Sequence, residues 1–210
     1  MPTQPYYLNG KRVPGVTTVL SLLGDNKRQL MIWANKEGME GRSISEKADE
    51  AATIGTIAHE MIEYELKGLE FDGKKYPEEL VASAENAYLA WLEWKDFFEF
   101  KDTASEVALV SQLGFGGTID IATIKKVRSI VDLKTSGGTY SDHLIQIAAY
   151  GQLWNEHHPD DPIRAYYILR LGKEDGSFHY HYYPDLDNEW EEFKCLLELY
   201  KRLPATKKKL

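Results

Sequence analysis

Two acidic residues and a lysine stand close together in a part of the chain that has the pattern of paired strands. The segment GTID ends in Asp120, and the segment VDLK, across a short basic turn, contains Asp132 and Lys134. Because successive side chains of a strand point to opposite faces, Asp132 and Lys134 share one face. If residues 125–127 form a three-residue hairpin loop, the register places Asp120 directly opposite Asp132. The three polar side chains then meet over one spot.

Such an arrangement favours a bound cation. Two carboxylates that face each other on a sheet repel, and either a divalent metal or a raised pKa relieves the repulsion. Oxygen ligands suit magnesium or manganese, and a nearby lysine can hold or polarise the attacking water of a phosphodiester hydrolysis. The hairpin alone is equally compatible with two acids at a sheet edge and a solvated lysine, because a register shift of one residue would separate the acids.

Further polar residues occur in two segments with a helical pattern. His59 lies in a helix that opens at Gly55 and has an apolar stripe on one side. Gln146 and Tyr150 are four residues apart in an otherwise apolar helix, so they are neighbours on one face. Each feature alone also fits an ordinary structural role, a satisfied histidine or a local hydrogen bond.

The order of these motifs is more informative than any one of them. The chain contains, in this order, GTIAH at 55–59, Glu106, GGTID at 116–120, DLKTS at 132–136 and the pair Gln146 and Tyr150. This order resembles the PD-(D/E)xK nuclease superfamily, specifically its RecB-like, phage-type exonuclease branch. The segment VPGVTTVL at 13–20 is similar to the leader of phage-type and mitochondrial genome maintenance exonucleases. The resemblance covers nearly the whole chain and implies a restriction-endonuclease-like core.

The resemblance also implies roles for single residues. Gln146 and Tyr150 would lie beside the site and orient the lysine or the substrate phosphate, and Glu106 matches a frequent acidic position at the start of the preceding strand. The implied metal ligands are His59, Asp120, Asp132 and the backbone carbonyl of Leu133, with Lys134 as the catalytic lysine.

The expected cofactor is Mg²⁺ or Mn²⁺, because an imidazole ligand makes the site slightly softer than one built from oxygen alone. Iron–sulfur members of the superfamily need four cysteines, whereas this chain contains only Cys195, so no such cluster can form.

The activity implied is that of a metal-dependent deoxyribonuclease that degrades DNA from its ends in phage-type recombination, repair or genome processing. Two alternatives stay open: an endonuclease of the same superfamily, and a non-catalytic module that binds nucleic-acid ends or a protein. The joint presence of Asp120, Asp132 and Lys134 favours catalysis, because a non-catalytic domain has no need to keep two repelling acids beside a lysine. DNA is the expected partner, a recombination or single-strand-binding protein is a further candidate, and the oligomeric state is open.

The expected fold class is α/β, with a central mixed sheet flanked by helices and an N-terminal helical region. One nuclease domain spans 1–210, in which 1–104 are mainly helical and 105–210 form the catalytic sheet and a C-terminal helix. A short hairpin or loop is expected around Asn9 and Gly10. Helices are predicted near 27–40, 43–67, 77–99, 141–157 and 187–202, and strands near 105–111, 115–124, 128–134, 163–171 and 177–183.

Composition agrees with a compact enzyme, since 210 residues with 43% hydrophobic content suffice for one core. No apolar run has the length of a membrane span and no signal peptide is recognised, so the expected compartment is the cytoplasm, that of the host if the chain is phage-encoded. The net charge of −8 argues against strong sequence-independent DNA binding, unless cations gather locally. Six basic residues do concentrate in the predicted sheet region: Lys125, Lys126, Arg128, Lys134, Arg164 and Arg170.

Two other metal patterns are weaker. His59 and Glu60 begin like the HExxH helix of zinc proteases, but Glu63 occupies the position of the second histidine. His179 and His181 lie two residues apart in an aromatic strand, where solvent-facing histidines on an edge strand are a sufficient explanation.

Overall fold

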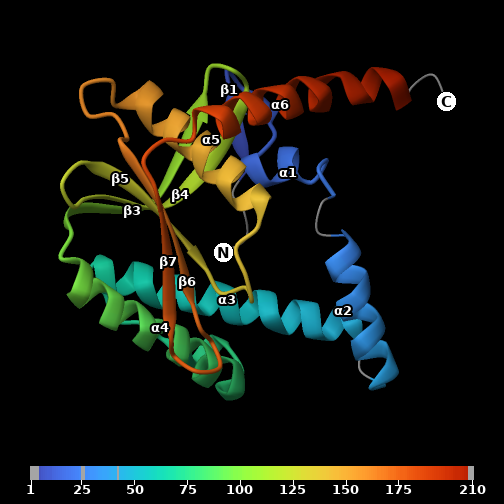
Figure 1. Ribbon diagram of the computed structural model, residues 1–210, viewed down its shortest axis with the longest axis vertical. Coiled ribbons are helices and arrows are strands. Elements are labelled where there is room, and N and C mark those ends of the chain that lie inside the picture. The colour runs from blue at the N-terminus through green and yellow to red at the C-terminus, as the bar shows by residue number, and fades with distance from the viewer. Residues whose placement is uncertain (1–4, 25–26, 42, 208–210) are drawn as a thin grey trace.

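The computed structural model describes residues 5–24, 27–41 and 43–207 of the chain. A five-stranded sheet with the order β3-β4-β5-β6-β7 forms its centre (Figure 1). The β5–β6 pair is parallel and the other pairs are antiparallel, so the sheet is mixed as the sequence predicts. The strands are β3 (Lys101–Ser111), β4 (Phe115–Ile124), β5 (Arg128–Lys134), β6 (Ala165–Leu171) and β7 (Phe178–Tyr183).

Helices cover both faces of this sheet, which confirms the α/β class (Figure 1). One face packs against α3 (Ile44–Leu66) and α4 (Glu78–Phe98). The other face packs against α1 (Val16–Leu20), α5 (Ser141–His157) and α6 (Asp187–Lys207). The remaining elements are β1 (Tyr6–Leu8) and β2 (Lys11–Val13), which pair as a hairpin at Asn9 and Gly10, α2 (Lys27–Met39), which lies to one side of the body in Figure 1, and the short helix η1 (Gly73–Lys75).

Strand β5 is buried on both faces. Val131 and Leu133 pack into the cluster under α3 and α4, and Ile130 packs into the cluster under α1, α5 and α6. This explains why the strand reads as an almost continuous apolar run interrupted by Asp132. No helix of the described residues is long and apolar enough to cross a membrane.

The hairpin of β4 and β5 has the predicted register. Residues 125–127 form its loop, and Ile121 pairs with Val131 and Ala122 with Ile130. The regular pairing ends at Ile121 and Val131, one step before the two acids. Beyond that point the side chain of Asp120 connects the two strands, because its Oδ2 accepts a hydrogen bond from the backbone N–H of Leu133 at 2.8 Å.

Strand β3 begins at Lys101, four residues earlier than predicted, so the division between a helical part and a sheet part at 104/105 is displaced. The polar start of this strand is held by contacts from distant residues. Thr103 shares a hydrogen bond with Thr123, and the Arg128 guanidinium donates to the carbonyl of Asp102. The last helix likewise continues through Pro204 to Lys207, beyond the predicted end at 202.

Candidate active site

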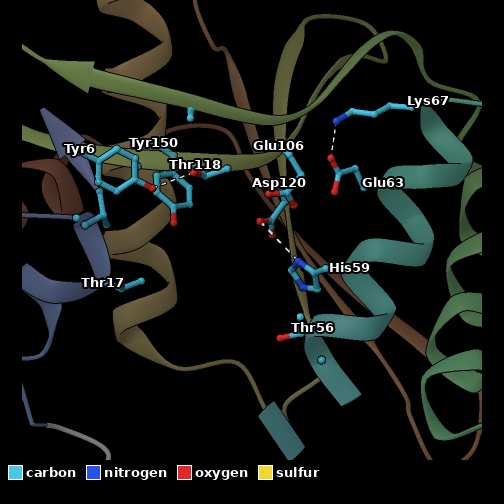
Figure 2. A pocket seen from close by; sticks show the side chains of 15 residues that line it. Tyr6, Thr17, Thr56, His59, Glu63, Lys67, Glu106, Thr118, Asp120 and Tyr150 are labelled. Atoms are coloured by element: carbon cyan, nitrogen blue, oxygen red, sulfur yellow. Dashed lines mark hydrogen bonds and ion pairs between the residues drawn. The ribbon is translucent and has the colours of Figure 1, made fainter. Parts of the chain in front are cut away.

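Three side chains from three elements converge on one point. His59 comes from α3, Glu106 from β3 and Asp120 from β4, and one potential ligand atom of each lies within 4.8 Å of the others. His59 Nδ1 lies 3.8 Å from Asp120 Oδ1, as the dashed line in Figure 2 marks. All three are half-buried, so a cation bound between them would be partly shielded from water.

Close packing at Gly55 brings His59 to this point. A Cβ atom at Gly55 would lie 2.9 Å from Thr135 Oγ1, so the glycine lets α3 pass near the loop after β5 without displacing that side chain. His59 follows one turn later on the same helix and therefore faces the ends of the strands. The GTIAH segment thus reflects a packing requirement and a functional side chain together.

Glu106 has an unusual backbone for a strand residue. Its φ of 53° lies in the left-handed region that favours glycine, and it stands between two regular pairs of β3 and β4, Ser105 with Ile121 and Val107 with Ile119. Such a conformation costs on the order of 1–3 kcal/mol and persists where flanking structure holds it. The carboxylate lies beside that of Asp120 (Figure 2).

A chain of polar contacts continues from Asp132 to α5. Lys134 Nζ lies 2.6 Å from Asp132 Oδ2 and donates to Gln146 Oε1 at 3.1 Å. Gln146 Nε2 in turn donates to the Tyr150 hydroxyl at 2.8 Å. Gln146 and Tyr150 are therefore neighbours, and Gln146 contacts the lysine; their roles in the site stay predictions. Lys134 is held in place from two sides.

Burial and charge shift the pKa values of this site in directions that matter for metal binding. Burial, assisted by the nearby charge of Lys134, lowers the pKa of His59 to about 4, so the imidazole is neutral at pH 7. Burial and the charges of Asp120 and Glu63 raise the pKa of Glu106 to about 7.

The pKa values of the other two carboxylates are shifted in the same direction as that of Glu106. Burial raises the pKa of both Asp120 and Asp132, against the opposing charge of Lys134. Burial lowers the pKa of Lys134, but the negative charges of Asp132 and Asp120 raise it by more. The pKa is therefore raised overall, and the ammonium group stays charged. The acids are therefore crowded and short of positive charge.

These residues fit a divalent cation. Asp132 is 1% exposed, and neither of its carboxylate oxygens has a hydrogen-bond partner among the described residues, although Oδ2 is ion-paired with Lys134. A buried oxygen without a partner is costly unless something else satisfies it. A neutral imidazole and several carboxylates form the mixed nitrogen and oxygen ligand set that suits manganese as well as magnesium.

A cavity of about 450 Å³ opens over the cluster. At one end Tyr6 and Thr118 share a hydrogen bond between their hydroxyl groups at 2.9 Å, and at the other Glu63 forms an ion pair with Lys67 (Figure 2). His59 lies between these two ends.

The structure brings together most of the residues that the sequence singles out, with one change in their arrangement. The compact group consists of His59, Glu106 and Asp120, whereas the carboxylate of Asp132 forms an ion pair with Lys134. Leu133 contacts the group through its backbone, whose N–H donates a hydrogen bond to Asp120. A role of Asp132 and of the Leu133 carbonyl as metal ligands stays a prediction.

Among the charged residues of the cavity, sequence reasoning missed Glu63 and Lys67. They follow His59 at intervals of four on α3, a spacing that places all three on one helix face and could have revealed them. Glu60 points elsewhere, since its carboxylate contacts Lys75 and Tyr76. The protease-like pattern around His59 therefore lacks its general base as well as its second histidine.

Comparison with known proteins gives matches only among solved structures, since no family model and no curated protein matches this chain. A putative exonuclease from Eubacterium rectale is 13% identical, with a TM-score of 0.49, over 72% of this chain and 65% of that one. LHK-Exo, solved in complex with dAMP, is 13% identical, with a TM-score of 0.39, over 76% of this chain and 92% of that one. The chain thus spans less than two thirds of the first protein. Likeness at this level does not bear on the chemistry, which rests on the geometry above.

Proposed function

We propose that this protein is a metal-dependent DNA exonuclease. The observation that carries the proposal is the convergence of His59, Glu106 and Asp120 at one cavity. The ion pair of Asp132 and Lys134 lies on the neighbouring strand beside them. A neutral imidazole, clustered acids and a charged lysine are the groups that phosphodiester hydrolysis with a divalent ion requires.

His59, Glu106 and Asp120 would hold the ion, with Asp132 and the Leu133 carbonyl as further candidate ligands. A bound Mg²⁺ or Mn²⁺ would supply positive charge to stabilise the phosphate in the transition state. The raised pKa values of Glu106 and Asp120 support this assignment. Burial, their main cause, withdraws the carboxylates from water, and a bound cation would stabilise the ionised form in its place.

Lys134 is the proposed catalytic lysine. Its ammonium is charged at neutral pH and is fixed between Asp132 and Gln146, so it can donate to an attacking water or to a phosphate oxygen. Gln146 is oriented in turn by Tyr150, whose pKa burial raises well above its ordinary value, so the phenol stays protonated. We assign Gln146 and Tyr150 to positioning.

The order of motifs in the sequence supports the remaining parts of the proposal. These are DNA as the substrate, degradation from its ends, and a role in phage-type recombination, repair or genome processing in the cytoplasm. The endonuclease and the non-catalytic binding module are the competing outcomes of the test below.

End-labelled linear DNA and sealed circular DNA, single- and double-stranded, would be incubated with Mg²⁺, Mn²⁺ or chelator. We expect metal-dependent loss of the linear substrates alone, with activity lowered at least about a hundredfold in Lys134→Ala. Lys194→Ala on α6 is the matched control, because Lys194 is ion-paired on the surface. This substitution removes the same charge as Lys134→Ala. Cutting of circles would establish an endonuclease, and binding without cutting would establish the non-catalytic module.

A further inference from the structure

A second groove lies beside the loop that follows Lys134. Its volume is about 470 Å³, and it is lined by residues 137–139, by Arg170 of β6 and by residues 178–181 of β7. The catalytic roles proposed above do not involve these lining residues. The groove lies at the carboxyl ends of β5 and β6, so it borders the candidate active site.

The sheet register connects the groove to the catalytic lysine. Lys134 pairs with Arg170, and Arg170 pairs with His179 on the edge strand β7. Paired residues of neighbouring strands project to the same face, so these three side chains form one row. With strands about 4.8 Å apart, the row extends roughly 10 Å from the candidate active site to the open edge of the sheet.

The row consists of hydrogen-bond donors suited to phosphate. A guanidinium presents a planar fork of N–H groups that matches phosphate oxygens, and an imidazole offers a further N–H. His179 is exposed and Arg170 half-buried. Both are therefore accessible from the groove that they line.

The groove also lacks the negative charge of the neighbouring cavity. No acidic side chain lines it within the described part of the chain, whereas the cavity above His59 contains Glu63, Glu106 and Asp120. Asp175 lies close enough for the charge of Arg170 to lower its pKa, although hydrogen bonds from Ser177, at 2.9 Å from the hydroxyl, are the larger cause.

One glycine leaves part of the groove's loop wall open. A Cβ atom at Gly137 would meet nothing within 4 Å, so a ligand can approach the backbone of the loop closely. This wall and the donor row face the same groove.

We propose that this groove binds the sugar–phosphate backbone of the DNA strand next to the bond that is cut, with Arg170 holding one phosphate and His179 supporting it. The proposal rests on the nuclease function and adds a substrate contact that is independent of base sequence. In a protein of net charge −8, such a local cation would contribute a large share of the DNA affinity.

The test compares Arg170→Ala and Arg170→Lys with Arg164→Ala. Arg164 is exposed just before the other end of β6, roughly 20 Å along the strand, and its removal changes the net charge equally. Binding of a fluorescent single-stranded oligonucleotide, with Ca²⁺ in place of Mg²⁺, would be measured by anisotropy over a range of salt.

For Arg170→Ala we expect Kd to rise about tenfold and the slope of log Kd against log salt to fall by about 1. Arg170→Lys should recover only part of the affinity, because it keeps the charge and loses the fork, and Arg164→Ala should match the wild type.

Hydrolysis of two substrates separates the groove from the nuclease function. DNA carries a neighbouring phosphate, whereas bis(4-nitrophenyl) phosphate is a single diester without one. We expect Arg170→Ala to raise KM for DNA and to hydrolyse the small diester like the wild type, while Lys134→Ala fails on both. If the wild type hydrolyses neither substrate, the nuclease function is wrong. If the wild type cuts DNA but Arg170→Ala keeps its affinity and salt slope, or loses activity on the small diester too, the role of the groove is wrong and the nuclease function stands.

Discussion

Glu106 is the residue whose ionisation depends most visibly on its surroundings. Burial and the charges of Asp120 and Glu63 raise its pKa to about 7, from an ordinary value of 4.5. The folded, metal-free protein therefore binds this proton more tightly than the unfolded chain does. The corresponding stability is fully present below about pH 4.5 and is lost as the pH rises through about 7.

Replacing Glu106 by Gln should remove this loss, because an amide keeps the shape and cannot ionise. In chelator, we expect the Tm of Glu106→Gln to exceed that of the wild type by at least about 2–4 °C at alkaline pH, the shift that about 1 kcal/mol gives in a domain of this size. Below about pH 4.5 the two should converge. His59, with its lowered pKa, acts in the opposite sense, but it is common to both proteins and cancels in the difference. Parallel melting curves across the whole range would show that Glu106 ionises normally.

His59 is expected to decide between metals. Imidazole is a softer ligand than carboxylate, so it favours manganese more than magnesium. We expect His59→Ala to weaken Mn²⁺ binding, measured by calorimetry, by at least about tenfold, and Mg²⁺ binding by less. An equal loss for both ions would mean that His59 only shapes the site.

At the scale of elements, the contact between β4 and α5 depends on one glycine. A Cβ atom at Gly117 would lie 2.7 Å from Tyr150 Cε1 and 2.9 Å from Leu153 Cδ1. The strand and the helix would have to move apart. Because Tyr150 and Gln146 lie on this helix, the hydrogen bond between Gln146 and Lys134 would be disturbed as well.

Gly117→Ala should therefore destabilise the fold by about 1–3 kcal/mol and lower nuclease activity as well. The control is Gly38→Ala, where an added Cβ meets nothing within 4 Å and helix α2 should gain up to about 1 kcal/mol. Thermal unfolding of both variants checks the difference. Equal stability of the two would show that α5 adjusts to the extra methyl group without cost.

The element scale also shows what sequence could supply. Periodicity and turn residues predicted the five longer helices and the five strands of the central sheet, but not the short helices α1 and η1. The loop at 125–127 gave the register of β4 and β5. The left-handed backbone of Glu106 could not be predicted, because it depends on contacts with distant elements, whereas the proximity of Asp132 and Lys134 follows from their alternation on one strand. The start of β3 at Lys101 was missed because contacts from two other strands hold it, from Thr123 of β4 and Arg128 of β5.

For the whole molecule, a divalent ion should act as a stabilising ligand. The acids of the site come from elements far apart in the sequence, so the unfolded chain does not hold them together. An ion that binds only the folded state at a hundredfold excess over Kd stabilises it by about 2.7 kcal/mol. We expect Mn²⁺ to raise the Tm by roughly 5–10 °C and chelator to reverse the shift. Asp120→Asn should abolish the response, and a persistent shift in that variant would place the ion elsewhere.

The polar chain from Asp132 through Lys134 to Gln146 and Tyr150 has a consequence for synthesis in the cell. The contact that steadies Lys134 comes from helix α5, and the strand that flanks β5 on its other side, β6, follows later still. A chain that has emerged from the ribosome only as far as β5 carries every proposed metal ligand but not these supports. We therefore expect the growing chain to remain inactive towards nearby nucleic acid until translation has passed β6, so that the order of synthesis itself delays the activity.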